Sequence, residues 1–248
     1  MKAGILLSVR AKATRLPGKV LKPLAGSSTV TEHLLRRLAG VRLAEKVILT
    51  TSTDPRDEIL VDIAASAGFA SFQGSLDDKL LRYRDAATAE GLDFVVVVDG
   101  DDPFVSVRHI DRIFGHAATQ GGDYIIVYGL PLGATGFGLS TDGLRRVCEG
   151  RGEENTEVWA SRYLDNPVFH CTRLMETDAR WTRPDIRMTL DYAEDYTFFS
   201  AVADGLAAEG RETSFENVMD YLAAHAETAE INRGVQEAYE THLRRSVG

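Results

Sequence analysis

Residues 94–103 have the sequence Phe-Val-Val-Val-Val-Asp-Gly-Asp-Asp-Pro, an apolar run that ends abruptly in three carboxylates. Five consecutive apolar residues, four of them β-branched, are typical of a strand buried on both faces, at the centre of a parallel sheet. Clustered carboxylates repel one another unless a cation lies between them, and hard oxygen ligands select Mg²⁺ or Mn²⁺. The stretch therefore predicts a central strand with a metal-binding end. The alternative is a turn in which Asp caps a helix starting near Ser106.

A cationic loop follows the first apolar run of the chain, Ile5-Leu6-Leu7, which predicts a short buried strand. Its five cations are Arg10, Lys12, Arg15, Lys19 and Lys22. Residues 1–31 contain no acid, although the whole chain has a net charge of -9. Because α/β folds bind anionic ligands at the C-terminal ends of their strands, this loop predicts a phosphate site. A solvated basic surface loop is the alternative interpretation.

Strand and helix patterns alternate over the first half of the chain. Strands are expected at 4–8, 46–51, 69–72, 94–98 and 124–128, and helices at 30–38, 54–67, 77–90 and 106–119. Thr29 and Glu32 have the spacing of a capping box for the first helix. This alternation predicts an α/β fold with a doubly wound, mostly parallel sheet, and we expect one domain over residues 1–248.

The alternation fails between residues 129 and 187, where glycines interrupt the pattern. Here a short helix is expected at 142–149, strands at 167–173 and 186–190, and a flexible substrate loop at 133–138. Two helices then follow at 193–208 and 214–225, and the polar tail from about 228 is a candidate for another. We interpret 129–187 as an excursion with little core of its own, which shapes an acceptor pocket or a subunit contact. Residues available for such a contact are Val158, Trp159, Tyr163, Leu164, Val168 and Phe169.

Composition narrows the class of protein. A net charge of -9 and a pI near 5.2 argue against binding to nucleic acid or to a membrane surface, which requires an extended basic face. The two cysteines are far apart in sequence, and no signal-peptide pattern or 18-residue apolar window occurs. We therefore expect two free thiols and a cytoplasmic location, with one disulfide as the alternative. Gly18-Lys19 lacks the remaining residues of a P-loop, and no GxGxxG follows the first strand.

Four motifs occur together and carry a specific resemblance. They are Arg10 with Thr-Arg-Leu-Pro-Gly-Lys at 14–19, Gly-Ser-Leu-Asp-Asp at 74–78, Gly-Asp-Asp-Pro at 100–103 and Thr-Leu-Asp-Tyr-Ala-Glu-Asp at 189–195. In this order they resemble the cytidylyltransferases, the family of CMP-Kdo synthetase, acylneuraminate cytidylyltransferase and the spore-coat polysaccharide protein SpsF. The resemblance covers nearly the whole chain and is firm for residues 3–115 and 186–206.

The resemblance implies a GT-A-like nucleotidyltransferase fold, CTP as donor, Mg²⁺ as cofactor and pyrophosphate as product. It implies that Arg10, Arg15 and Lys19 clamp the triphosphate, with Lys22 assisting. Such fixed cations stabilise the charge that develops on the departing pyrophosphate. Further nucleotide contacts are expected at Ser8, Thr51, Ser52, Ser75 and Asp99. Asp101 and Asp191 match the metal-binding carboxylates of the family, and its synthetases suggest a homodimer.

Two departures from the family pattern bear on function. Asp99 replaces the Gln or Thr that often precedes Gly-Asp, and an apolar, glycine-rich loop at 132–139 replaces an acidic one. We expect the enzyme to join CMP to a small anionic acceptor, either a 3-deoxy-ulosonic or nonulosonic acid or a phosphorylated polyol. One alternative is a GT-A glycosyltransferase that uses a nucleotide sugar, since Asp99-Gly100-Asp101 has the DxD form. Another is an inactive nucleotide-binding subunit.

Overall fold

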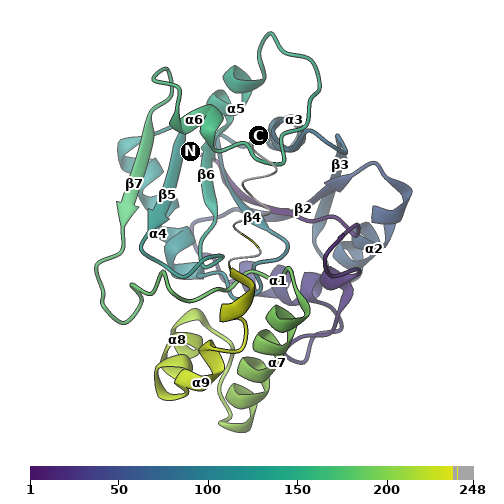
Figure 1. The fold of residues 1–248 in the computed structure, drawn as a ribbon. Helices are drawn as coiled ribbons and strands as arrows, with labels where there is room; N and C mark the ends of the chain where they lie inside the picture. The colour runs from purple at the N-terminus through teal and green to yellow at the C-terminus, as the bar shows by residue number, and fades with distance from the viewer. Residues whose placement is uncertain (237–238, 240–248) are drawn as a thin grey trace.

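The computed structural model describes residues 1–236 and Tyr239, and a seven-stranded sheet runs through its centre (Figure 1). The strands are β1 (Ala3–Ser8), β2 (Lys46–Ser52), β3 (Ala70–Gly74), β4 (Phe94–Asp99), β5 (Tyr124–Tyr128), β6 (Phe137–Ser140) and β7 (Cys171–Met175). Their order across the sheet is β3-β2-β1-β4-β6-β5-β7. All neighbours are parallel except β6, which runs antiparallel to β4 and β5. The predicted fold class is therefore confirmed.

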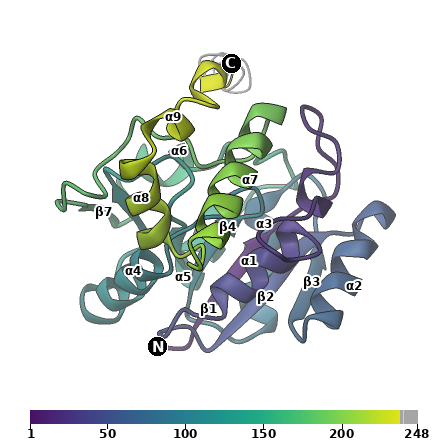
Figure 2. The ribbon, with the colours of Figure 1, turned by 90° about the horizontal axis from the view of Figure 1, so that it is seen from below.

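Helices cover both faces of this sheet. They are α1 (Val30–Leu38), α2 (Glu58–Ser66), α3 (Lys79–Ala89), α4 (Val107–Gln120), α5 (Thr141–Cys148), α6 (Ser161–Leu164), α7 (Ala193–Ala208), α8 (Phe215–Ala224) and α9 (Ala226–Ala229). Seen from below, α1, α4, α7 and α8 lie in front of the strands (Figure 2). Helices α3, α5 and α6 lie on the other side of the sheet, at the top of Figure 1.

Strand β4 connects the two cores that this layering creates. Phe94, Val96 and Val98 point into the core beneath α1, α4 and α7, whereas Val95 and Val97 point into the core beneath α3 and α5. Successive side chains of a strand face opposite sides of the sheet, so a strand covered on both sides must be apolar throughout. This explains why β4 has no polar residue before Asp99.

The predicted capping residues Thr29 and Glu32 form hydrogen bonds at the start of α1. Thr29 accepts a hydrogen bond from the backbone N–H of Glu32 at 2.9 Å, and Glu32 accepts one from the N–H of Ser28 at 2.8 Å. The hydrogen bond accepted by the Glu32 side chain therefore comes from Ser28, the residue before the N-cap Thr29. The helix predicted from Asp54 begins as a 3₁₀ turn over Pro55–Asp57 and continues as α2.

The structure corrects two predictions within the excursion. The expected substrate loop 133–138 contains the first half of β6, which pairs with β4 and lies inside the sheet. In the part of the chain that the structure describes, the expected strand at 186–190 is absent. An isolated β-bridge between Leu132 and Arg187 takes its place. A strand predicted at 167–173 is found slightly later, as β7. Gly138 interrupts the apolar pattern that would have predicted β6. Because it has no side chain, it fits against Ile113 and Phe94 and lets β6 pair within the sheet.

The expectation of little core in the excursion is also wrong. Trp159, Tyr163 and Phe169 are buried among Leu144, Tyr124 and other residues of the α3–α5 core. These three aromatic rings are therefore unavailable for a subunit contact, whereas Val168 is 70% exposed. The homodimer and the single-domain organisation stay predictions.

Three further expectations concern membranes, thiols and the C-terminal tail. Within residues 1–236 and Tyr239, no helix has the length and apolarity needed to cross a membrane. Cys148 and Cys171 are both free. The tail predicted from residue 228 begins with α9 and a 3₁₀ turn at Arg233–Val235, and the remainder of that prediction lies outside the described residues.

Gly138 provides a test of how β6 packs. A Cβ at this position would lie 2.5 Å from Ile113 Cγ2 and 2.8 Å from Phe94 Cζ, both in the core. We expect Gly138→Ala to lower the free energy of unfolding by about 1–3 kcal/mol, because overpacking forces the core to shift. Gly152→Ala is the control, since no atom lies within 4 Å of its added Cβ. Urea denaturation with equal stability for the two variants would contradict this packing.

Candidate active site

A cavity of about 860 Å³ opens where β1 and β4 end. Its walls come from the cationic loop after β1, the acidic turn after β4, the segment 126–133 that begins in β5, and Thr189 and Asp191 ahead of α7. Parallel strands end at the same edge of a sheet, which brings these distant segments together. The cavity therefore lies at the edge where the sequence predicted an anion site and a metal site.

The cationic loop and the acidic segments meet at Lys19. Its Nζ lies 2.6 Å from Asp101 Oδ2 and 3.0 Å from Asp191 Oδ1, and Arg15 donates to the same Asp191 oxygen at 2.5 Å. Burial opposes charge on Lys19, but the two carboxylates outweigh it and raise the pKa of this amine. Burial likewise works against the Asp191 carboxylate, yet Lys19 and Arg15 lower its pKa. Lys19 and Asp191 are therefore both charged at neutral pH.

Buried polar contacts fix the position of Asp191. Arg187, of which 3% is exposed, donates to Asp191 Oδ2 at 3.0 Å and to Asp195 Oδ1 at 2.9 Å. Asp195 in turn accepts from the backbone N–H groups of Asp191 and Tyr192 at 2.8 and 2.9 Å. This arrangement holds the carboxylate rigidly at the start of α7.

The acidic turn after β4 has the donor set of a divalent-cation site. One carboxylate oxygen from each of Asp99, Asp101 and Asp102 lies within 4.8 Å of the others. Burial, together with the neighbouring carboxylates, raises the pKa of Asp102 well above its ordinary value, and burial is also the largest cause of the raised pKa of Asp99. A cation among these oxygens would offset both the burial of the carboxylates and their mutual repulsion, so the residues fit a hard divalent ion.

The other residues that the sequence predicted to contact the nucleotide fall into two groups. Ser8, Arg10 and Asp99 line the cavity together with Arg15, Lys19, Asp101 and Asp191. Four others do not line it. The Lys22 amine lies over the Tyr196 ring, and Thr51 is buried in β2. The hydroxyl of Ser52 donates a hydrogen bond to Asp57, and that of Ser75 donates one to Glu153. Contact of these four with a nucleotide stays a prediction.

Comparison with known proteins establishes the family. A family model described as cytidylyltransferase matches residues 3–154. The chain belongs to the cytidylyltransferase family. It is accordingly a nucleotidyltransferase, as the order of its motifs predicted.

Relatives agree with this assignment. The spore coat polysaccharide biosynthesis protein SpsF of Bacillus subtilis (strain 168) is 29% identical over 203 residues, covering 79% of this chain and 84% of the relative. A 3-deoxy-manno-octulosonate cytidylyltransferase of Anaeromyxobacter dehalogenans (strain 2CP-C) is 29% identical over 210 residues, covering 84% and 80%. A solved cytidylyltransferase structure from Leptospira borgpetersenii serovar Hardjo-bovis (strain JB197) shares the fold. Its TM-score is 0.80 at 22% identity, with 92% of this chain and 97% of that chain covered.

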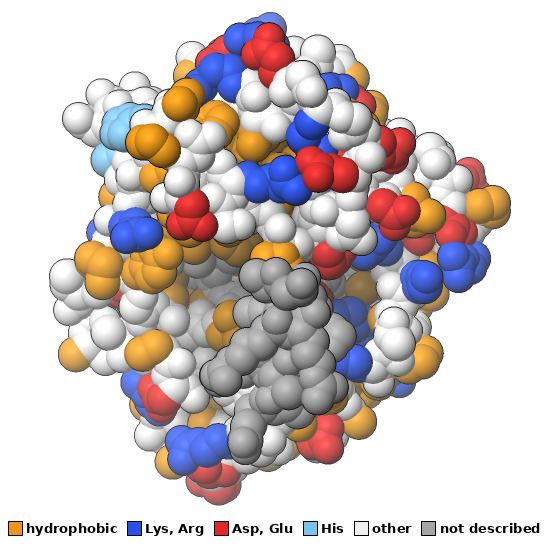
Figure 3. All heavy atoms as spheres, turned by 45° about the horizontal axis from the view of Figure 1, so that its top comes forward, with side chains coloured by type: hydrophobic (Ala, Val, Ile, Leu, Met, Phe, Trp, Pro, Cys, Tyr) orange, Lys and Arg blue, Asp and Glu red, His pale blue; other side chains and the backbone are white. Residues whose placement is uncertain are grey.

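Opposite walls of the cytidylyltransferase cavity differ in chemistry. Beyond the charged groups, Tyr128, Leu132 and Val158 face the cavity and are each more than a third exposed. In Figure 3 a hollow opens near the centre of the face, with hydrophobic side chains along its left margin and Lys and Arg side chains along its right. Exposed apolar groups inside a cavity are typical of a ligand contact surface.

Sequence reasoning missed several polar residues of the cavity. Glu157 accepts from Arg10 at 2.8 Å and lies 3.0 Å from Lys79 Nζ, and Lys79 also lies 3.7 Å from Asp99. Arg82 forms part of the same wall. Lys79 and Arg82 belong to an ordinary amphipathic helix pattern, and Glu157 lies in an irregular segment. No spacing in the sequence marks any of them as cavity residues.

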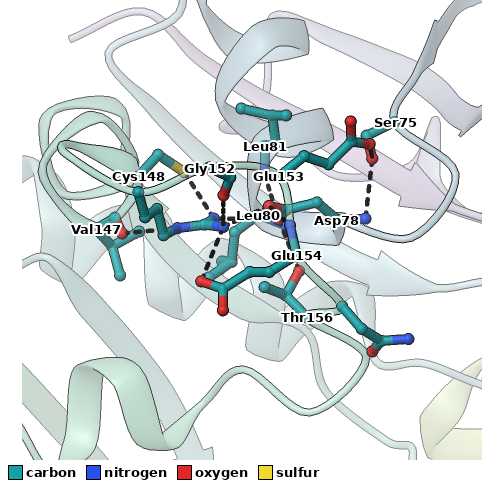
Figure 4. A network of polar contacts seen from close by, with 12 residues as sticks. Ser75, Asp78, Leu80, Leu81, Val147, Cys148, Gly152, Glu153, Glu154 and Thr156 are labelled. Atoms are coloured by element: carbon teal, nitrogen blue, oxygen red, sulfur yellow. Dashed lines mark hydrogen bonds and ion pairs between the residues drawn. The ribbon is translucent and has the colours of Figure 1, made fainter.

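The segment that carries Glu157 is anchored on Asp78, the N-cap of α3 (Figure 4). The fully buried Asp78 carboxylate accepts hydrogen bonds from Arg151, from Thr156 Oγ1 and from the backbone N–H groups of Leu81 and Glu154. Burial opposes charge on Asp78, but these bonds, Arg151 first, lower its pKa to about 2. The carboxylate therefore positions residues 151–158 over the cavity.

We expect Asp78→Asn to lower the free energy of unfolding by about 3 kcal/mol at pH 7, because Arg151 loses its buried partner. The folded-state pKa of Asp78 is below its ordinary value of 3.8, so this stabilisation is present above about pH 4 and is lost as the pH falls toward 2. Urea denaturation at pH 7 and pH 3 measures both effects. Asp85→Asn, at a half-buried carboxylate beside Arg84, is the control. Equal losses for the two variants at pH 7 would refute the anchoring role.

Proposed function

We propose that this cytidylyltransferase transfers CMP from CTP to a small anionic acceptor and releases pyrophosphate. The acceptor would be a 3-deoxy-ulosonic or nonulosonic acid or a phosphorylated polyol. The single observation that carries the proposal is the contact of Lys19 with Asp101 and Asp191, which joins a cationic loop and an acidic turn in one cavity. Phosphate groups and a divalent cation are the ligands complementary to these two surfaces.

Arg10, Arg15 and Lys19 would bind the triphosphate in this mechanism. Negative charge accumulates on the departing pyrophosphate as the bond between the α-phosphorus and the bridging oxygen breaks. Cations that are already positioned stabilise this charge without reorganising. Each of the three pairs with a carboxylate before ligand binding, so the triphosphate replaces those carboxylates as their partner.

Asp99, Asp101 and Asp102, with Asp191 facing them across Lys19, would hold Mg²⁺. When bound, the ion neutralises phosphate charge and helps to orient the triphosphate. The protein's own contribution is the buried cluster of carboxylates, kept in place by the turn after β4 and by Arg187 beside Asp191.

The acceptor would occupy the opposite wall, formed by Tyr128, Leu132 and Val158. One of its oxygens attacks the α-phosphorus in line, a new oxygen–phosphorus bond forms, and pyrophosphate leaves from the other side. This displacement needs positioning and charge neutralisation and no protein nucleophile. The apolar side chains of the wall exclude water, which would otherwise compete as a nucleophile.

A pyrophosphate-release assay with CTP, Mg²⁺ and a panel of sugar acids and polyol phosphates tests the function. The proposal predicts CMP-conjugate formation with at least one of these acceptors. Release of nucleotide diphosphate from a UDP-sugar, without turnover of CTP, would instead indicate a glycosyltransferase. Absence of CTP binding would refute the proposal outright.

Lys19→Ala should reduce turnover of CTP by roughly 10²-fold or more, because a cation that stabilises the transition state is lost. Lys46→Ala is the matched control, since Lys46 pairs with Glu90 at the far end of β2, away from the cavity. Steady-state kinetics of both variants measure the effect. Unchanged turnover in Lys19→Ala would mean that this amine only balances charge in the ligand-free protein.

Asp101→Asn should reduce activity by roughly 10²-fold or more and weaken Mg²⁺-dependent binding of CTP, because an amide offers an oxygen without its charge. Titration calorimetry of CTP at several Mg²⁺ concentrations measures this directly. Asp142→Asn, at an exposed residue of α5, should behave like the unmodified protein. If the Mg²⁺ dependence of Asp101→Asn were unchanged, the carboxylate would have a structural role only.

A further inference from the structure

Tyr239 lines the active-site cavity from a part of the chain that no motif singled out. It lies outside residues 3–154, which match the family model, and outside the four motifs that predicted the site. Of the residues that the structure describes, it is the only one beyond α7 that faces the cavity. The family assignment therefore says nothing about this side chain.

Three side chains of the segment after α9 converge on Arg187. Asn232, of which 1% is exposed, donates from Nδ2 to the Arg187 carbonyl oxygen at 3.2 Å and to Asp195 Oδ1 at 2.9 Å. Gln236 accepts a hydrogen bond from Arg187 Nη1 at 3.2 Å. The centre of the Tyr239 ring lies 4.4 Å from the guanidinium carbon. The buried amide thus fixes where the segment meets the site, and the ring lies on the arginine.

The Tyr239 ring covers the Arg187 guanidinium on the side of the cavity. Arg187 is 3% exposed and does not line the cavity, whereas the ring in contact with it does. Water weakens an ion pair because of its high dielectric constant. By excluding water, the ring strengthens the pairs of Arg187 with Asp191 and Asp195, and its electron-rich face attracts the cation directly.

The same ring lies near a second arginine of the site. The Arg15 guanidinium carbon is 5.8 Å from the centre of the Tyr239 ring and 5.3 Å from that of Tyr192. Arg15 pairs with Asp191 Oδ1, and Arg187 pairs with Oδ2 of the same carboxylate. Burial, with Asp191 adding to it, raises the pKa of Tyr239 to about 12. A neutral aromatic ring, and not a phenolate, therefore faces the two cations.

We propose that Tyr239 is a positioning residue of the active site, whose ring holds Arg187 on Asp191 so that this carboxylate keeps one orientation while its other partners exchange. The inference rests on the proposed function, in which Lys19 and Arg15 turn from Asp191 to the triphosphate. Of the three ion-pair partners that Asp191 has within the described residues, Arg187 alone then remains. The side chain that secures Arg187 thereby controls how Asp191 meets Mg²⁺.

The first test compares Tyr239→Leu, which removes the ring, with Tyr239→Phe, which keeps it. Titration calorimetry of CTP at several Mg²⁺ concentrations measures the Mg²⁺ needed for half-maximal binding. We expect this concentration to rise about 10-fold in Tyr239→Leu, the usual effect of losing a group that orients a metal ligand, and to be unchanged in Tyr239→Phe. Tyr221→Leu is the control, because the Tyr221 ring stacks on His225 and does not line the cavity. It should leave the Mg²⁺ requirement unchanged.

An unchanged Mg²⁺ requirement in Tyr239→Leu, with folding verified by circular dichroism, would overturn the inference. An equal rise in Tyr239→Phe would also overturn it, because the hydroxyl and not the ring would then be responsible. If Tyr239→Leu does not fold, Tyr239→Met replaces it, since the flexible methionine side chain fills the space of the ring without its aromatic face.

The second test needs neither nucleotide nor metal. NMR of the arginine side chains follows hydrogen exchange at the Nε–H of Arg187, which donates to Asp195 Oδ1, and Arg187→Lys identifies the signal. We expect exchange to be about 10-fold faster in Tyr239→Leu than in the unmodified protein and in Tyr239→Phe, because water reaches the guanidinium. Equal rates in all three proteins would overturn the positioning of Arg187 by the ring. If the rates differ as expected but the unmodified protein does not bind CTP, the proposed function fails and the contact of the ring with Arg187 stands.

Discussion

The ion pairs of the Lys19 ammonium hold the candidate active site together. One Nζ atom joins the loop after β1 to Asp101 at the end of β4 and to Asp191 ahead of α7, which are 82 and 172 residues away in sequence. Lys19 is mostly buried, and its pKa is raised by the two carboxylates, while Lys19 and Arg15 lower the pKa of Asp191. Without this contact, Lys19 would lose both of its carboxylate partners, and Asp101 would have no ion-pair partner within the part of the chain that the structure describes.

This arrangement explains how a chain with a net charge of -9 can present a cationic loop inside a cavity. Basic and acidic groups are segregated along the sequence and neutralise each other only after folding. In the proposed function, anionic and cationic ligands would bind by exchange of ion-pair partners, which costs less free energy than exposing unpaired charges. At the α3 end, Glu157 lies beside Arg10 and Lys79, and cations that include Arg82 outweigh its burial and lower its pKa. The wall of Tyr128 and Leu132 is apolar instead. The cavity thus has three regions with different chemistry.

Much of the fold could be predicted because short-range patterns carry it. The run 94–98 is apolar because β4 is covered on both faces, and Thr29 caps α1 through bonds within four residues. The antiparallel strand β6 could not be predicted. Its Gly138 is required by the close approach of Phe94 and Ile113, which are distant in sequence. Trp159 and Tyr163 were misassigned for a related reason, since their burial depends on α3 and α5.

The sequence by itself determined the α/β class, the cationic loop and the carboxylates after the central strand, because each depends on neighbouring residues. The family, too, follows from the order of these motifs. Only the tertiary structure decided that Lys19 lies between Asp101 and Asp191, that Asp78 anchors the segment of Glu157, and that Arg82 faces the cavity. These contacts join residues from separate elements, and their energies depend on burial and distance, which the packing of the sheet and its helices sets.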